Sequence, residues 1–193
     1  MTRKLSRAGV TAAAVILATA AAGCGGSSST ASTTKSAGAR APEASPAGDI
    51  PDNQAFVPYA LPGGGFTVKV PEGWSRTGAG GAGGAVTFTD KLNAIRLETV
   101  KAAAAPTARG ERARAGAGAH VTKVTRKAGT AIRATYLADA KPNAVTGKAG
   151  KNAVERYVFF HRGQDVVLTL SGPKGADNVD PWKIVTDSVR FTR

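Results

Sequence analysis

Cysteine, histidine and aromatic residues are scarce in this chain, and each scarcity excludes a class of site. The 193 residues include one cysteine and two histidines. A single cysteine rules out an intramolecular disulfide and a cysteine-based zinc site, and two histidines remove most metal and triad schemes. Aromatic residues make up only 6% of the chain, and the 42% that is hydrophobic consists mostly of alanine and valine. We therefore expect one domain with extra ends and a core confined to part of the chain.

Acidic residues are also few, with 13 against 26 lysines and arginines, and the formal net charge is +13. Such a balance favours an anionic lipid headgroup or wall polymer as a partner, although a solvated basic face without a defined partner would look the same. No nucleic-acid module accompanies the charge, so nucleic acid is not an expected partner. The candidate contacts to an anionic surface are the tightest basic group and its neighbours: Arg109, Arg112, Arg114, Lys123, Arg126 and Lys127.

The first 23 residues have the three-part order of a secretory signal peptide. Arg3, Lys4 and Arg7 form a basic start, residues 8–22 are uncharged and mostly apolar, and small residues precede Cys24. The uncharged run is shorter than the roughly 20 helical residues that span a bilayer. We therefore expect residues 1–23 to direct export and then to be removed.

Cys24 is the candidate site of lipidation. Small residues directly before this cysteine resemble the lipobox of bacterial lipoproteins, with Ala21 in the place of the usual leucine. The resemblance implies that the thiol receives a diacylglyceryl group and that Cys24 becomes the mature N-terminus, held by two acyl chains in the outer face of the cytoplasmic membrane. The alternative is an ordinary secretory signal that is cut elsewhere and leaves an unpaired, reactive thiol.

Residues 24–52 are predicted to form a disordered tether. They are rich in serine, threonine, alanine, glycine and proline, and Ile50 is their one large apolar residue. Such a segment buries too little surface to offset the entropy of ordering it. The folded domain is therefore expected over residues 53–193.

Within that domain the hydrophobic pattern indicates a sheet. Apolar and polar residues alternate with the period of two that is typical of half-buried strands, and Phe66, Val68 and Val70 are the first such set. The predicted strands and hairpins cover residues 66–70, 85–100, 121–126, 130–138, 154–160 and 165–171. A short helix is expected over residues 107–115.

A second helix is predicted near the C-terminus. Asp180 is expected to cap it with Pro181 at its first position, and Trp182, Val185 and Val189 share one face. A short strand is expected over residues 189–192. The predicted class is α+β, an antiparallel sheet with helices packed against it.

Two segments carry a family resemblance. The segment from Phe66 to Trp74, with its Pro-Glu-Gly-Trp turn, is similar to the opening strand and turn of PsbP-like domains, and the segment from Asp180 to Phe191 is similar to their closing helix and strand. The whole resembles small PsbP-like or LpqN-type bacterial lipoproteins. This resemblance implies an α/β/α sandwich, and relatives that serve as subunits or binding partners of other proteins. No functional residue of the family transfers with it.

Sequence motifs for catalysis or cofactors are weak. The glycines of residues 78–84 match G-x-G-x-x-G, but a strand follows where the dinucleotide fold needs a helix, so a hairpin loop is expected. The oxygen-bearing Asp177, Asn178 and Asp180 do not supply a full calcium shell. Trp74 and Trp182 could line a ligand cleft, although burial in the core is the commoner use. We expect no cofactor, metal or catalytic residue.

These observations favour a non-enzymatic binding or adaptor module, anchored by lipid outside the cytoplasmic membrane. Its expected partners are the membrane, through acylated Cys24, and an envelope protein or an anionic wall or lipid component. The alternative is a carrier of a small ligand such as a lipid or wall component, or a hydrolase, that uses a cleft between the sheet and the helices. A pocket with converging titratable groups would favour the alternative.

Overall fold

The computed structural model describes residues 46–81, 83–142 and 147–192. All of them belong to one compact unit, Pro42–Arg193. The predicted signal peptide, the candidate lipidation site Cys24 and the predicted tether up to residue 45 lie outside the described residues. No helix in the described ranges is long and apolar enough to cross a membrane.

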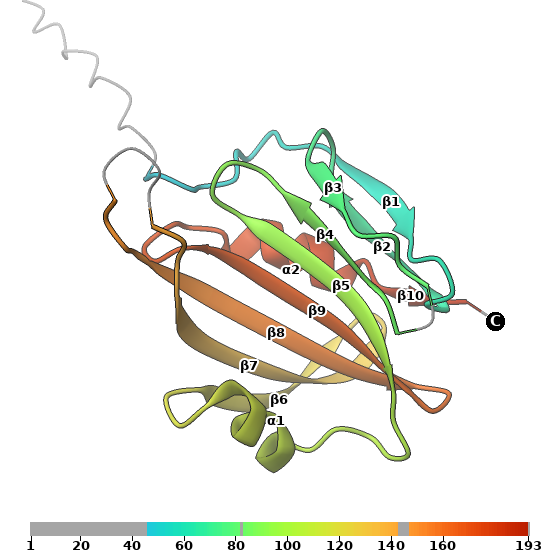
Figure 1. Ribbon diagram of the computed structural model, residues 1–193. Helices are drawn as coiled ribbons and strands as arrows, with labels where there is room; N and C mark the ends of the chain where they lie inside the picture. Colours follow the sequence, from blue (N-terminus) through green and yellow to red (C-terminus); the bar gives the residue numbers. More distant parts are fainter. Residues whose placement is uncertain (1–45, 82, 143–146, 193) are drawn as a thin grey trace, which may run out of the picture. The chain divides into compact units, whose positions relative to one another are not determined.

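A seven-stranded sheet forms the centre of the domain (Figure 1). Its strand order is β3-β4-β5-β9-β8-β7-β6, and every neighbouring pair is antiparallel. Consecutive strands mostly pair with each other, as expected for hairpins joined by short turns. The strands are β3 (Ser75–Thr77), β4 (Ala85–Thr89), β5 (Ala94–Lys101), β6 (His120–Arg126), β7 (Gly129–Asp139), β8 (Lys151–His161) and β9 (Gln164–Pro173).

A second, three-stranded sheet joins the N-terminal part of the domain to its last strand. Its order is β1-β2-β10, with β1 (Phe56–Ala60), β2 (Phe66–Pro71) and β10 (Arg190–Phe191). The alternation of β2 places Phe66, Val68 and Val70 in the same core as the large sheet, each 2% exposed or less. The small sheet therefore packs on one face of the large one.

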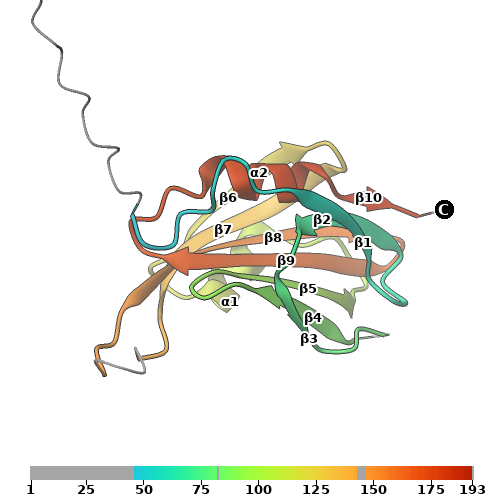
Figure 2. The ribbon, with the colours of Figure 1, turned by 90° about the horizontal axis from the view of Figure 1, so that it is seen from above.

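The two helices lie on opposite faces of the large sheet, as Figures 1 and 2 show. On α2 (Val179–Asp187), Trp182 and Val185 join the core that also holds Tyr157 and Phe159 of β8. On α1 (Ala108–Ala115), the buried Glu111 pairs with Arg156, the β8 residue directly before Tyr157. Because successive strand side chains point to opposite faces, α2 and α1 cover different sides, and the predicted fold class is confirmed.

Most predicted elements are present, and two strands escaped prediction. Thr107 caps α1, since its hydroxyl accepts a hydrogen bond from the Gly110 amide (3.1 Å). β3 and β4 form the expected hairpin on either side of the glycine-rich loop. β1 contains Pro58, which has no amide proton and argues against a strand unless that strand is at an edge. β1 is such an edge, and β3 is only three residues long.

Asp180 does not cap α2, which corrects the predicted start of that helix. The cap is Asn178, and α2 begins at Val179, so Pro181 stands inside the first turn. Amides in that turn lack intrahelical partners, so the missing proton of proline is harmless there. The Asn178 side chain does not bond the helix, because it is engaged with a distant segment.

That segment is residues 48–50, which the structure places inside the folded domain, upstream of the boundary expected at residue 53. The Asn178 Oδ1 atom accepts a hydrogen bond from the Ile50 amide (2.8 Å), and its Nδ2 donates to the Gly48 carbonyl (3.0 Å). Asn93 donates to the same carbonyl (2.9 Å). Both asparagines are 3% exposed or less, and Ile50 is 3% exposed within the core. Residues 48–50 therefore belong to the folded domain rather than to the predicted tether.

We expect Ile50→Ala to lower the free energy of unfolding by about 2–5 kcal/mol, because it removes a fully buried aliphatic side chain. Ile184→Ala is the matched control, since Ile184 is 45% exposed, and it should change stability by no more than about 0.5 kcal/mol. Urea unfolding of both variants checks the difference. Equal losses would show that residues 48–52 are not part of the fold.

Candidate functional site

Two hollows in the surface are candidates for a binding site. The larger, of about 770 Å³, runs along α2 and is named the α2 groove. Both hollows fall in the size range of ligand sites, about 300–1,000 Å³. The α2 groove is lined by Pro58, Thr67, Val68, Lys69, Lys127, Asp180, Lys183, Ile184, Asp187, Ser188 and Arg190.

Cations from four separate elements line the α2 groove. Lys69 comes from β2, Lys127 from the β6–β7 turn, Lys183 from α2 and Arg190 from β10. Across the described ranges, the ammonium groups of these three lysines make no ion pair. The Arg190 guanidinium donates to two backbone carbonyls, at 2.9 and 2.6 Å, and pairs with no carboxylate of residues 46–81, 83–142 and 147–192. The groove therefore offers positive charge to a ligand.

Hydrogen bonds at the end of α2 fix the floor of the α2 groove. The Ser188 hydroxyl accepts from the Lys69 amide (2.7 Å) and donates to the Val185 carbonyl (2.6 Å). β10 pairs with β2 through Arg190 opposite Thr67. Three of the four cations, Lys69, Lys183 and Arg190, therefore come from elements that are hydrogen-bonded to one another.

The second hollow, of about 590 Å³, lies beside α1 and is named the α1 cavity. It is mostly apolar, with Lys123 as its one ionisable residue and Phe160 as a ring that is 37% exposed. No titratable groups converge in it as catalysis would need. Its lining comprises Ala105, Pro106, Thr107, Ala108, Lys123, Ala128, Thr130, Ala131, Ile132, Val158, Phe160 and Phe191.

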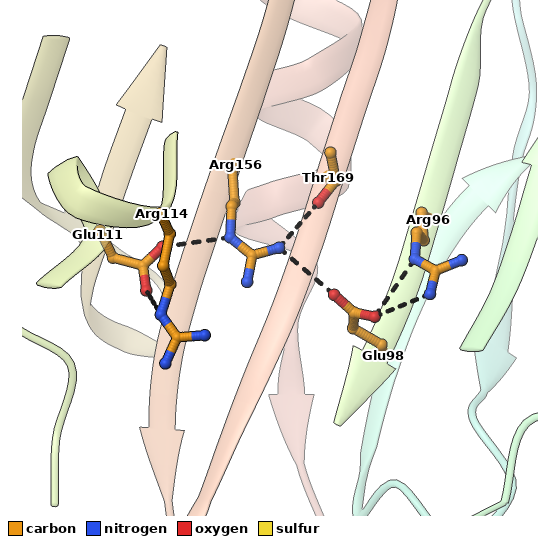
Figure 3. Close-up of polar contacts among 6 residues, drawn as sticks. All are labelled: Arg96, Glu98, Glu111, Arg114, Arg156 and Thr169. Carbon is orange, nitrogen blue, oxygen red and sulfur yellow. Dashed lines mark hydrogen bonds and ion pairs between the residues drawn. The ribbon is translucent and has the colours of Figure 1, made fainter. Parts of the chain in front are cut away.

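A network of charges on the same side of the sheet holds α1 in place (Figure 3). Glu111 of α1 is 3% exposed, and its Oε2 lies 3.2 Å from Arg156 Nε. The Nη1 atom of Arg156 lies 3.3 Å from Glu98 Oε1 and 3.4 Å from the Thr169 hydroxyl. Arg114 is 3.5 Å from the other oxygen of Glu111. Buried charges are tolerated only when paired, so this network is a structural clamp between α1 and the sheet.

Asp165 is the least satisfied acid near this clamp. Its Oδ1 atom is buried and has no hydrogen-bond partner among the described residues. Burial, and then the charge of Glu111, raise the pKa of the Asp165 carboxyl above its ordinary value, against the opposing effect of Arg114 and Arg156. Ionised Asp165 is therefore destabilising in the folded state.

A second, partly buried network lies on the α2 side. The Tyr157 hydroxyl donates to Glu155 (2.7 Å) and accepts from Arg126 (2.9 Å), while Arg133 pairs with the same glutamate. Burial raises the pKa of Tyr157, and the hydrogen bond to Glu155 adds to the rise. Arg126 also lies 3.8 Å from Asp187 of α2. These groups join β6, β7, β8 and α2. Because they bond to one another, they stabilise the fold rather than offer charge to a ligand.

The six basic residues singled out in the sequence do not share one surface. Arg109, Arg112 and Arg114 are exposed on α1, and Lys123 lines the α1 cavity. Arg126 bonds Tyr157 on the opposite face, and Lys127 lines the α2 groove. A role for these residues at an anionic surface stays a prediction, and the structure places them on two opposite faces of the sheet.

The residues that complete the α2 groove were missed in the sequence. Lys69, Lys183 and Arg190 are isolated basic residues in separate elements, and only pairing of β2 with β10 brings their elements together. No local spacing could have revealed them. Of the two tryptophans weighed as cleft residues, Trp182 is 7% exposed within the core and Trp74 packs against it, as favoured.

Comparison with known proteins shows similarity of fold only. No protein-family profile and no curated protein matches the sequence. A crystal structure from Bacteroides thetaiotaomicron is similar at 15% identity and a TM-score of 0.50, over 70% of this chain and 48% of that one. This chain thus spans about half the length of that protein.

Two further solved structures are similar at lower scores. The Ran-binding protein Mog1p of Saccharomyces cerevisiae has 11% identity and a TM-score of 0.46, covering 72% of this chain and 96% of its own. Cyanobacterial PsbP (CyanoP) of Synechocystis has 14% identity and a TM-score of 0.44, with 76% and 99% covered. A PsbP protein is thus among the similar structures, and no function is drawn from them.

Removing the cation of the α1 clamp should be strongly destabilising. Arg156→Met leaves Glu111, whose side chain is 4% exposed, without its strongest partner, and we expect a loss of about 3–5 kcal/mol in the free energy of unfolding. Arg96→Met removes a 50% exposed arginine from the same network and should cost less than about 1 kcal/mol. Denaturant titration of both variants measures the contrast, and similar losses would contradict the clamp.

Asp165→Asn should change how stability depends on pH. Because the pKa of Asp165 is raised in the folded state, its favourable contribution is complete below the unfolded pKa of about 4 and is lost as pH rises through the folded pKa. The variant should therefore gain stability relative to the wild type as pH rises from about 4 toward neutrality. Thermal unfolding across that interval measures the difference, and a difference independent of pH would refute it.

Proposed function

We propose that this protein is a non-enzymatic binding module of the cell envelope, anchored through acylated Cys24 outside the cytoplasmic membrane. The acyl chains hold the N-terminus in the lipid, and the segment before Gly48 is the tether that carries the domain. The domain itself makes the contacts to an envelope protein or to an anionic wall or lipid component. The basic residues Arg109, Arg112, Arg114 and Lys123 remain candidate contacts on the α1 side.

The distribution of charge carries this proposal. The buried Glu111 and the partly buried Glu98 and Glu155 are each bonded to arginines that hold one element against another. The lysines of the α2 groove, by contrast, are exposed and make no ion pair with an acid among the residues that the structure describes. The paired glutamates and arginines thus stabilise the fold, whereas the exposed lysines of the groove are available to a partner. This division supports binding as the function.

A second candidate function is the carriage of a small apolar ligand, and the α1 cavity favours it. The hollow has about 590 Å³ and a mostly apolar lining that includes one cation, Lys123. Such a composition suits an apolar ligand with one anionic group. It does not support the hydrolase alternative, which needs converging titratable groups.

The anchor is tested at Cys24. Mass spectrometry of the mature protein purified from cells should find residue 24 as its N-terminus with acyl chains attached, and Cys24→Ala should move the protein from the membrane fraction to the soluble or secreted fraction. Cys24 is the sole cysteine, so no other thiol confuses the assignment. An unmodified residue 24 in the native protein, or retention of residues 1–23, would overturn the anchoring.

A further inference from the structure

We infer that the α2 groove binds an extended, acidic segment of a partner protein. This inference rests on the proposed binding function and gives its partner a chemical class. It concerns residues that the charge clusters of the sequence do not include, chiefly Lys69, Lys183 and Arg190.

Charge complementarity is the first reason. Four cations line the groove against two carboxylates, Asp180 and Asp187, and Asp187 already lies 3.8 Å from Arg126. The hollow therefore has a positive excess. Its lysines make no ion pairs in the described part of the chain. A carboxylate of the partner can therefore pair with them without breaking an existing ion pair.

The form of the site is the second reason. The lining includes the apolar Pro58, Val68 and Ile184, of which Ile184 is 45% exposed. An extended peptide presents alternate side chains to opposite sides, so apolar residues can contact this lining while acidic residues reach the lysines. Peptides bound in this way gain specificity from pockets for alternate side chains.

A protein segment fits these observations better than a lipid surface. The groove is a hollow of about 770 Å³ rather than a projecting basic face, and a flat bilayer would not fill it. Asp180 and Asp187 stand among the cations and would repel a continuous layer of phosphates. A mixed pattern of charges instead sets the register of one partner and rejects others.

A synthetic peptide tests the inference directly. The probe is a short fluorescent peptide of alternating glutamate and leucine, titrated by anisotropy against the full-length chain in non-ionic detergent. We expect binding that weakens as salt rises and that falls about tenfold or more in the double variant Lys69→Glu, Lys183→Glu, since each change replaces attraction by repulsion. The matched control is Lys101→Glu, an exposed lysine at the end of β5, which should bind as the wild type does.

Several results would overturn the inference. One is equal binding of the peptide with glutamine in place of glutamate, and another is an equal loss in the Lys101 control, because either removes the role of the groove. A third is that the wild type binds phosphatidylglycerol vesicles but not the peptide, and that the double variant loses the vesicle binding. That result would assign the groove to lipid. Circular dichroism of each variant separates misfolding from lost contacts. A failure of acylation at Cys24 would leave the peptide result standing, since the groove lies wholly within the folded domain.

Discussion

The whole domain depends on a sheet whose interior strand β8 is covered on both faces. Alternation along β8 sends Tyr157 and Phe159 into the core beneath α2 and the small sheet, and sends Arg156 and Val158 toward α1. A residue added or removed in this strand would exchange the two sets. The large core and the clamp on α1 therefore stand or fall together with one strand register.

The two faces of the large sheet are stabilised by different interactions. On the α2 side, large aromatic and aliphatic groups bury enough surface to hold two sheets and a helix together. On the α1 side, few large apolar residues are present, and α1 is held by the paired charges of Glu111 and Arg156 together with a small apolar cluster. The composition of the chain, rich in arginine and poor in aromatics, accounts for this use of ion pairs.

Strands that alternate strictly, such as β2 and β4, could be predicted from the sequence because burial of one face imposes a period of two. β1 could not, since Pro58 hides a strand that only an edge position permits. The role of Asn178 was also hidden, because its partners at residues 48–50 are more than a hundred residues away along the chain. Local patterns report local geometry, and a buried amide that bonds a distant backbone leaves no trace in its own neighbourhood.

By itself, the sequence determined the fold class, the turn at the glycine-rich loop and the approximate positions of both helices, because hydrophobic periodicity is local. The start of α2 was predicted two residues too late, since its cap is Asn178 rather than Asp180. The sequence also supplied the export and lipidation pattern around Cys24, which lies outside the described residues. Only the tertiary structure decided which charges are buried partners and which are free. Lys69 and Arg190 line the same groove because β2 pairs with β10. These strands lie at opposite ends of the domain in sequence, and their pairing depends on how the entire domain packs.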